Sequence, residues 1–136
     1  MKKEPYIAVI DDDHDDYTFV CESFQKFHSI PVHHFSKGST FFDSIDYTKT
    51  DNLCLIIVDL NMPETSGTET AKKIKENPFL NSIPVLVLTT GGTPAEIEIC
   101  KKLGIEIFKK PCTLVEWNSI ALVMSSFFDP RLMKAI

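Results

Sequence analysis

The chain has 136 residues, of which 43% are hydrophobic and 24% are charged, and its formal net charge is -5. This length and composition suit one globular domain, and the acidic balance argues against nucleic-acid binding, which needs a basic face. No apolar stretch approaches the length of a membrane span, and the N-terminal apolar run is short and ends in acidic residues, so we expect no membrane segment and no signal peptide.

Apolar strands and amphipathic helices alternate in the predicted secondary structure. In chain order we expect a strand at 6–10, a helix at 15–27, a strand at 30–35, a helix within 36–45, a strand at 53–59, a helix at 67–77, a strand at 83–90, a helix at 93–104, a strand at 105–108 and a helix at 114–128. Alternating units of this kind predict an α/β fold with a parallel sheet covered by helices on both faces. Asp15 and Asp16 suit the start of the first helix, as caps and as anions near its positive end.

One carboxylate, Asp59, directly follows the apolar run of the third strand in the segment "LIIVDLNMP". A run this apolar is typical of a central strand covered on both faces. Asp59 would then lie at the carboxyl edge of the sheet, where open α/β sheets bind ligands. Taken alone, the residue could equally well cap a loop.

The other strands also end in polar residues, and in a parallel sheet these ends lie on one edge. The residues concerned are Asp11, Asp12 and Asp13 after the first strand, Thr89 and Thr90 on the fourth, and Lys109, Lys110 and Pro111 after the fifth. Crowded carboxylates repel one another unless a cation is present, and Mg²⁺ favours oxygen ligands from one or two carboxylates plus a phosphate. With a nearby lysine and hydroxyl, this set predicts a site for phosphoryl transfer to a carboxylate.

Cysteine and histidine spacing predicts no other metal site. The four cysteines lack a CxxC pair or zinc-finger spacing, and the four histidines lack an HExxH motif. We therefore expect reduced thiols and a cytoplasmic location. His33 and His34 fall on the predicted second strand, where we expect surface or half-buried side chains.

The ordered segments "IAVIDDD", "LIIVDLNMPETSG", "IPVLVLTT" and "KKP" resemble the response-regulator receiver domain of two-component signalling. The resemblance covers residues 6–128. It implies a flavodoxin-like, doubly wound sheet of five parallel strands in the order 2-1-3-4-5. It also implies one receiver domain over 1–136, with a core at 6–128 and a short tail at 129–136. Because only eight residues follow Phe128, we expect no output domain after it.

The resemblance also implies a metal site and a phosphorylation site. Asp59 matches the phosphoacceptor, and Asp11 and Asp12 match the acidic pair that holds Mg²⁺, with Asp12 as the direct ligand and Asp11 acting through water. Asn61 would offer its backbone carbonyl to the metal, so the implied metal set is Asp11, Asp12, Asp59 and Asn61.

Thr89 matches the hydroxyl residue of the family's switch, and Lys110 matches the lysine that contacts the phosphoryl oxygens. A cis peptide bond between Lys110 and Pro111 is implied as well, because only proline tolerates that geometry at low cost. The sequence departs from the family at the aromatic position three residues before the lysine, which is Ile107. Either Phe108 serves as the aromatic switch through a shortened loop or the aromatic half of the switch is missing; strand alternation places the two side chains on opposite faces.

Competing interpretations fit the residues less well. A haloacid-dehalogenase-type phosphatase needs a second acid two residues after the first, where this chain has Asn61. Three aspartates after the first strand would repel the phosphate of a flavodoxin-like carrier, and no P-loop motif is present. The alternative that stays open is a degenerate receiver, which acts as an interaction module without phosphorylation. We expect a switch rather than an enzyme for an outside substrate.

The expected partners are a sensor histidine kinase or histidine phosphotransfer protein and an unidentified downstream protein. The last predicted helix carries one charged residue, Glu116, between Leu114 and Phe128. Leu114, Trp117, Ala121 and Met124 can form its core stripe, which leaves other bulky apolar residues outside. This pattern predicts a partner surface or a homodimer through the last helix, unless the tail 129–136 folds back over it.

Overall fold

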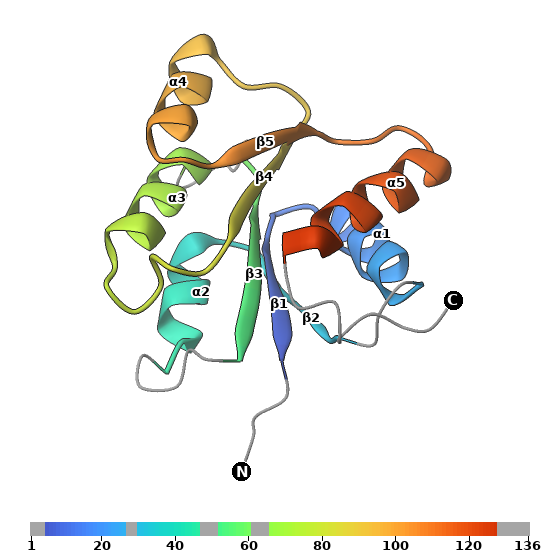
Figure 1. The fold of residues 1–136 in the computed structure, drawn as a ribbon, viewed down its shortest axis with the longest axis horizontal. Helices are drawn as coiled ribbons and strands as arrows, with labels where there is room; N and C mark the ends of the chain where they lie inside the picture. The colour runs from blue at the N-terminus through green and yellow to red at the C-terminus, as the bar shows by residue number, and fades with distance from the viewer. Residues whose placement is uncertain (1–4, 27–29, 47–51, 61–65, 128–136) are drawn as a thin grey trace.

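The computed structural model describes residues 5–26, 30–46, 52–60 and 66–127, and these residues form a three-layer α/β fold (Figure 1). The strands are β1 (Tyr6–Ile10), β2 (Val32–Phe35), β3 (Leu53–Val58), β4 (Val85–Thr89) and β5 (Glu106–Lys109). The helices are α1 (His14–Gln25), α2 (Gly38–Ser44), α3 (Gly67–Glu76), α4 (Pro94–Lys102) and α5 (Leu114–Met124), with a 3₁₀ turn at Ser125–Phe127. Every predicted strand and helix is present, and most of the observed ends differ from the predicted ends by one to a few residues.

The five strands form one parallel sheet in the order β2-β1-β3-β4-β5, as expected. β1 and β3 are apolar inner strands, and nearly all of their side chains are buried. They pair so that Ile10 lies opposite Val58. At the β5 end of the strand order, Thr89 of β4 lies opposite Lys109 of β5.

Each face of the sheet carries its own apolar core. Helices α2, α3 and α4 cover one face, and α1 and α5 cover the other (Figure 1). Strand alternation explains the division, because Ile56 and Val58 join the first core while Leu55 and Ile57 join the second. Within the described ranges no helix has the length and apolar character needed to cross a membrane.

Capping residues fix where the helices begin. Asp13, rather than Asp15 or Asp16, is the N-cap of α1, and its carboxylate accepts the backbone N–H groups of both of those residues. Thr93 and Glu96 form a capping box at the start of α4. The N-terminal ends of the helices are thereby held beside the carboxyl ends of the strands, where the polar residues of the sequence gather.

Candidate functional site

Two buried carboxylates lie side by side at the carboxyl edge of the sheet. Asp11 and Asp59 are the residues that follow the paired positions Ile10 and Val58, and the backbone N–H of Asp59 donates to the carbonyl of Ile10 (3.0 Å). Their exposed fractions are only 5% and 4%. Registration of the two strands therefore forces two acidic groups into one poorly solvated space.

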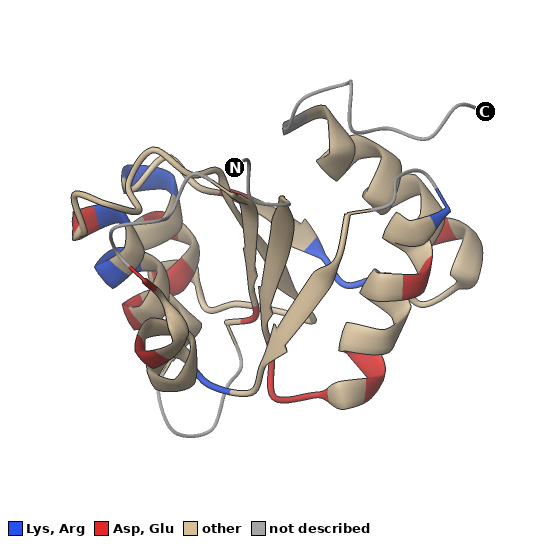
Figure 2. Ribbon diagram, turned by 90° about the horizontal axis from the view of Figure 1, so that it is seen from below, with Lys and Arg blue, Asp and Glu red and all other residues tan. Residues whose placement is uncertain are grey.

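Asp12 adds a third carboxylate at the exposed rim of this space. Oxygen atoms of Asp11, Asp12 and Asp59 all lie within 4.8 Å of one another. Figure 2 shows the acidic stretch in red where the chain passes from β1 into α1. Three carboxylates this close suit a hard divalent cation such as Mg²⁺. Asn61, the fourth expected ligand, lies outside the described residues.

Burial makes Asp11 a weak acid. Loss of hydration and the negative charge of Asp59 raise the pKa of Asp11 to about 6. A hydrogen bond from the backbone N–H of Asp13 (2.9 Å) and the charge of Lys110 act in the opposite direction and lower this pKa. A cation at this site would compete with the proton on Asp11, because a metal ligand must be deprotonated.

Lys110 supplies the positive charge of the site. Its Nζ atom lies 3.0 Å from Asp11 Oδ2, 3.4 Å from Asp59 Oδ2 and 2.6 Å from Asp16 Oδ2. Burial alone would lower the pKa of Lys110, but the hydrogen bond to Asp16 and the charges of Asp11 and Asp59 together raise it above its usual value. Lys110 is therefore a fixed cation at neutral pH.

The expected cis bond before Pro111 is wrong for this structure, because no peptide bond among the described residues is cis. The backbone N–H of Lys110 donates to the carbonyl of Thr89 (2.8 Å). This bond continues the pairing of β4 and β5 by one residue, so a trans peptide already directs the lysine side chain toward the carboxylates.

Thr89 is buried at the end of β4, on the same edge. Its hydroxyl donates to the carbonyl of Gly91 (3.1 Å) and accepts the N–H of Gly91 (3.2 Å). The hydroxyl thus supports the loop at 89–94 that leads into α4. A movement of this side chain would disturb both bonds and with them the backbone of the loop.

The two candidates for the aromatic switch position point to opposite faces. Ile107 packs against the core under α2–α4, and Phe108 packs against the core under α1 and α5. Ile107 occupies the position three residues before Lys110 and faces α4. The position at which the family resemblance implies an aromatic residue therefore carries isoleucine, and Phe108 packs against the core of the other face.

Sequence reasoning missed two contacts of the site. Asp16 reaches Lys110 from the first turns of α1, although these residues are separated by 94 positions. His34 of β2 is half-buried, and its Nε2 lies 2.6 Å from the carbonyl oxygen of Asp11. A carbonyl only accepts, so Nε2–H is the donor. The only signal for Asp16 was its place one helical turn after the acidic end of β1.

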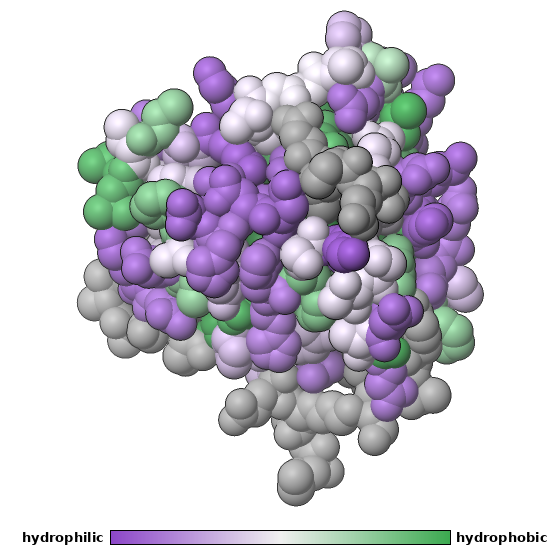
Figure 3. Space-filling model, turned by 180° about the vertical axis from the view of Figure 1, so that it is seen from behind, coloured by the Kyte–Doolittle hydropathy of each residue, from purple (hydrophilic) through white to green (hydrophobic). Residues whose placement is uncertain are grey.

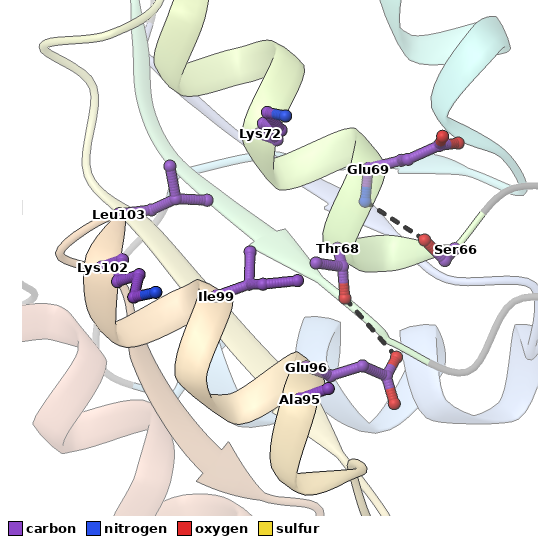
Figure 4. Close-up of a pocket in the computed structure, with 9 residues that line it drawn as sticks. All are labelled: Ser66, Thr68, Glu69, Lys72, Ala95, Glu96, Ile99, Lys102 and Leu103. Atoms are coloured by element: carbon purple, nitrogen blue, oxygen red, sulfur yellow. Dashed lines mark hydrogen bonds between the residues drawn. The ribbon is translucent and has the colours of Figure 1, made fainter.

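A groove of about 480 Å³ lies between α3 and α4 (Figure 4). Ile99 and Leu103 of the α4 segment give it an apolar wall, and Thr68 Oγ1 of α3 donates to Glu96 Oε2 of α4 across one end (3.4 Å). Because Glu96 also belongs to the capping box of α4, this hydrogen bond ties the start of α4 to α3.

A parallel sheet of order 2-1-3-4-5 with carboxylates and a lysine at its carboxyl edge defines the class of flavodoxin-like receiver folds. The family model of the response regulator receiver domain matches residues 7–119. The chain belongs to this family, which is a signalling domain of two-component systems.

Relatives and solved structures agree with this assignment. The two-component response regulator ARR17 of Arabidopsis thaliana is 32% identical over 84% of this chain and 80% of its own length. The chemotaxis protein CheV1 of Helicobacter pylori is 34% identical over 54% of this chain, and the match spans only 24% of that relative. The match to the rice response regulator ORR11 spans 39% of that relative.

Two crystal structures show the same fold. The phosphorylated cyanobacterial phytochrome response regulator RcpA superposes with a TM-score of 0.78 over 92% of this chain and 94% of its own, at 24% identity. The Mn²⁺-bound form of response regulator Rcp1 gives a TM-score of 0.77 over 97% of each chain, also at 24% identity.

Proposed function

We propose that this protein is a phosphorylation-dependent response regulator that accepts a phosphoryl group on Asp59. The observation that carries the proposal is the position of Asp59, which is buried, belongs to a cluster of three carboxylates and lies 3.4 Å from the ammonium group of Lys110. A carboxylate is a weak nucleophile toward a phosphoryl group unless the charges of both are neutralised. The site offers that neutralisation from two sides.

Asp11, Asp12 and Asp59 would hold Mg²⁺, with Asn61 as a further ligand. When bound, the ion supplies positive charge to the phosphoryl oxygens and orients them. Lys110 supplies a second, permanent positive charge beside Asp59. In transfer from a phosphohistidine, an oxygen of Asp59 forms the new bond to phosphorus, the P–N bond breaks and the departing imidazole takes up a proton.

The proposed switch runs from Thr89 into α4. A phosphoryl group adds about 1.5 to 2 negative charges, and the Thr89 hydroxyl can donate to it only by giving up its bond to the Gly91 carbonyl. The loop at 89–94 would then rearrange, and the Thr68–Glu96 bond is the contact that α4 would have to break in order to move relative to α3.

The proposed partners are a histidine kinase or histidine phosphotransfer protein, a downstream protein, and a second copy of the chain through α5. We also propose that residues 6–128 form the whole receiver core. The cytoplasmic location stays a prediction.

Acetyl phosphate, a small acyl phosphate, tests the proposal. Intact-mass spectrometry should detect one added phosphoryl group when Mg²⁺ is present and none in its absence. Asp59→Asn should abolish the addition, whereas Asp43→Asn, a variant of an acidic residue on α2, should retain it. Equal labelling of the Asp59→Asn variant would contradict the assignment, and a folded wild-type protein that is never labelled would favour the phosphorylation-independent module.

A further inference from the structure

The carboxylate nearest to Lys110 belongs to neither the proposed metal set nor the proposed phosphoacceptor. Asp16 Oδ2 lies 2.6 Å from Lys110 Nζ, closer than Asp11 Oδ2 at 3.0 Å and Asp59 Oδ2 at 3.4 Å. Asp16 lies on α1, outside the three-carboxylate cluster. The shortest contact of the lysine is therefore made with a carboxylate on which none of the proposed chemistry takes place.

An ammonium group has three N–H donors and no acceptor. In this structure three carboxylates lie within 3.4 Å of Lys110 Nζ, and the shortest of these contacts is the hydrogen bond to Asp16 Oδ2. A phosphoryl group on Asp59 would bring three more strong acceptor oxygens to the same place. Lys110 can bind them fully only by weakening one of its existing contacts.

Asp16 is the partner that Lys110 can leave at the lowest cost. The side chain of Asp16 is 23% exposed, compared with 7% for Asp11 and 4% for Asp59. A partly exposed carboxylate recovers hydration when its partner departs, whereas a buried one is left unsatisfied. Asp16 also carries a negative charge that opposes the arrival of a phosphoryl group.

We propose that Asp16 is a positioning residue that holds Lys110 in the unphosphorylated protein and competes with the phosphoryl group for it. The inference rests on the proposed function and adds a means of regulating it. Asp16 lowers the affinity of the site for the phosphoryl group and so lowers the share of the protein in the activated state. The competition acts mainly through Lys110, with a smaller direct repulsion from the Asp16 charge, since Asp16 itself lies outside the cluster of Asp11, Asp12 and Asp59.

Beryllofluoride, a phosphoryl mimic, measures this competition at saturating Mg²⁺. Asp16→Asn removes the charge and the acceptor strength while keeping the size, and we expect it to tighten beryllofluoride binding about tenfold, as NMR titration would show. Asp15→Asn is the matched control, because Asp15 is the exposed neighbour on the same helix and its loss changes net charge equally. The control should change the affinity less than about twofold, because an exposed charge acts only at a distance.

Two further variants separate competition from structural support. Asp16→Glu restores the carboxylate and should return the affinity toward the wild-type value, and Asp16→Ser replaces Asp16→Asn if the latter does not fold. A purely structural role would loosen binding, so tighter binding is a result that structural damage cannot produce. The lifetime of the phosphorylated protein should lengthen in parallel.

The outcomes distinguish this inference from the proposed function. If the wild type binds beryllofluoride and Asp16→Asn binds it equally or more weakly, the competition is absent and the role of Asp16 is overturned. If the folded wild type binds no beryllofluoride with Mg²⁺ present, the proposed function fails, and the role of Asp16 fails with it.

Discussion

At the scale of single residues, Asp11 shows how a binding site opposes folding. Its pKa of about 6 lies above the ordinary value of 3.8, mainly because burial removes hydration from the carboxylate. The folded protein therefore holds the proton to higher pH than the unfolded chain does. As the pH rises from about 4 to 6 the folded state loses this preferentially bound proton, and the free energy of unfolding falls.

We expect Asp11→Asn to stabilise the metal-free protein at pH 7. The ionised carboxylate costs the folded state about 1 to 2 kcal/mol there, after screening by water at the rim of the site, and the neutral amide removes that cost. Urea unfolding with a chelator present should show the difference at pH 7, and below about pH 4 it should vanish because the wild-type carboxyl is then neutral too. A variant less stable than the wild type at pH 7 would show that the contact with Lys110 outweighs the desolvation.

Gly67, the first residue of α3, is a second residue on which the site depends. A Cβ atom there would lie 2.0 Å from the carbonyl oxygen of Asp59 and 2.6 Å from the Cα of Leu60. Both neighbours are backbone atoms, so no side chain can turn aside, and α3 packs directly on the segment that carries Asp59.

Gly67→Ala is expected to lower the free energy of unfolding by at least about 2 kcal/mol. Gly91→Ala is the control, since a Cβ atom added at Gly91 would meet no heavy atom within 4 Å, and it should stay within about 0.5 kcal/mol of the wild type. Equal stability of the two variants in chemical denaturation would show that α3 can shift away from Asp59 without loss.

The residues of the site differ in how far the sequence could predict them. Asp11, Asp59 and Lys110 each follow a strand directly, and Asp12 is the next residue after Asp11. Strand prediction and the shared edge of a parallel sheet are therefore enough to bring them together. The contact of Asp16 depends on the rotation of α1 over the sheet, which neither periodicity nor spacing fixes to within a hydrogen bond. Its N-terminal position predicted a capping role, but Asp13 fills that role in the structure.

At the scale of elements, the alternation of β5 settles a question that the sequence left open. Both Ile107 and Phe108 were candidates for the aromatic switch position, because the segment before Lys110 is short. The register of β5 with β4 places Ile107 opposite Val87 and on the α4 face. Isoleucine has no hydroxyl and less bulk than an aromatic ring, so under the proposed function we expect any movement of Thr89 to be transmitted through aliphatic packing.

The switch is expected to follow the α4 face and to bypass the α5 face. On addition of Mg²⁺ and beryllofluoride, NMR shifts should concentrate in the loop at 89–94, at the start of α4 and in the methyl groups of Ile107. The ring signals of Phe108 serve as the internal control and should change little, because this side chain packs on the opposite face of the sheet. Shifts confined to the neighbours of Asp59 would contradict a propagated switch. Large shifts of Phe108 would show that the change reaches the face covered by α1 and α5, against this prediction.

At the scale of the whole molecule, the strand order and the two-faced core followed from repeated βα units and from the family resemblance. What the sequence could not supply are contacts between elements far apart in the chain, such as Asp16 with Lys110 and His34 with the Asp11 carbonyl. Such contacts depend on the packing angles of the helices and on the position of the edge strand. These angles and positions differ among sequences that share the same hydrophobic pattern.

The outer face of α5 is unusually apolar for a helix at the surface. Trp117, Ala121 and Met124 are buried as expected, but Leu114, expected in the same stripe, is 51% exposed. Leu114 is the first residue of α5, three residues before the first buried residue of the stripe. Figure 3 shows apolar atoms at the left edge of the molecule, the side on which α5 lies.

Val115, Leu122 and Val123 add to this exposed apolar face, with exposed fractions of 74%, 49% and 49%. Val115 and Leu122 are seven residues apart and share one side of the helix. Phe19 of α1 is exposed as well and stacks on Trp117, with ring centroids 5.8 Å apart. The apolar surface thus continues from α5 onto α1, as is typical of surfaces that bind a partner.

We expect this surface to form a homodimer whose stability increases on activation. Light scattering after size exclusion, with and without beryllofluoride, should show a larger share of dimer in the activated wild type. Val123→Glu and Val115→Glu should reduce the dimer, because each would bury a charge in an apolar contact. Phe79→Glu, at an exposed apolar position just after α3, is the control and should leave the dimer intact. A wild type that remains monomeric in both conditions would exclude self-association and leave a heterologous partner, while unfolding of both α5 variants would assign these valines to the core.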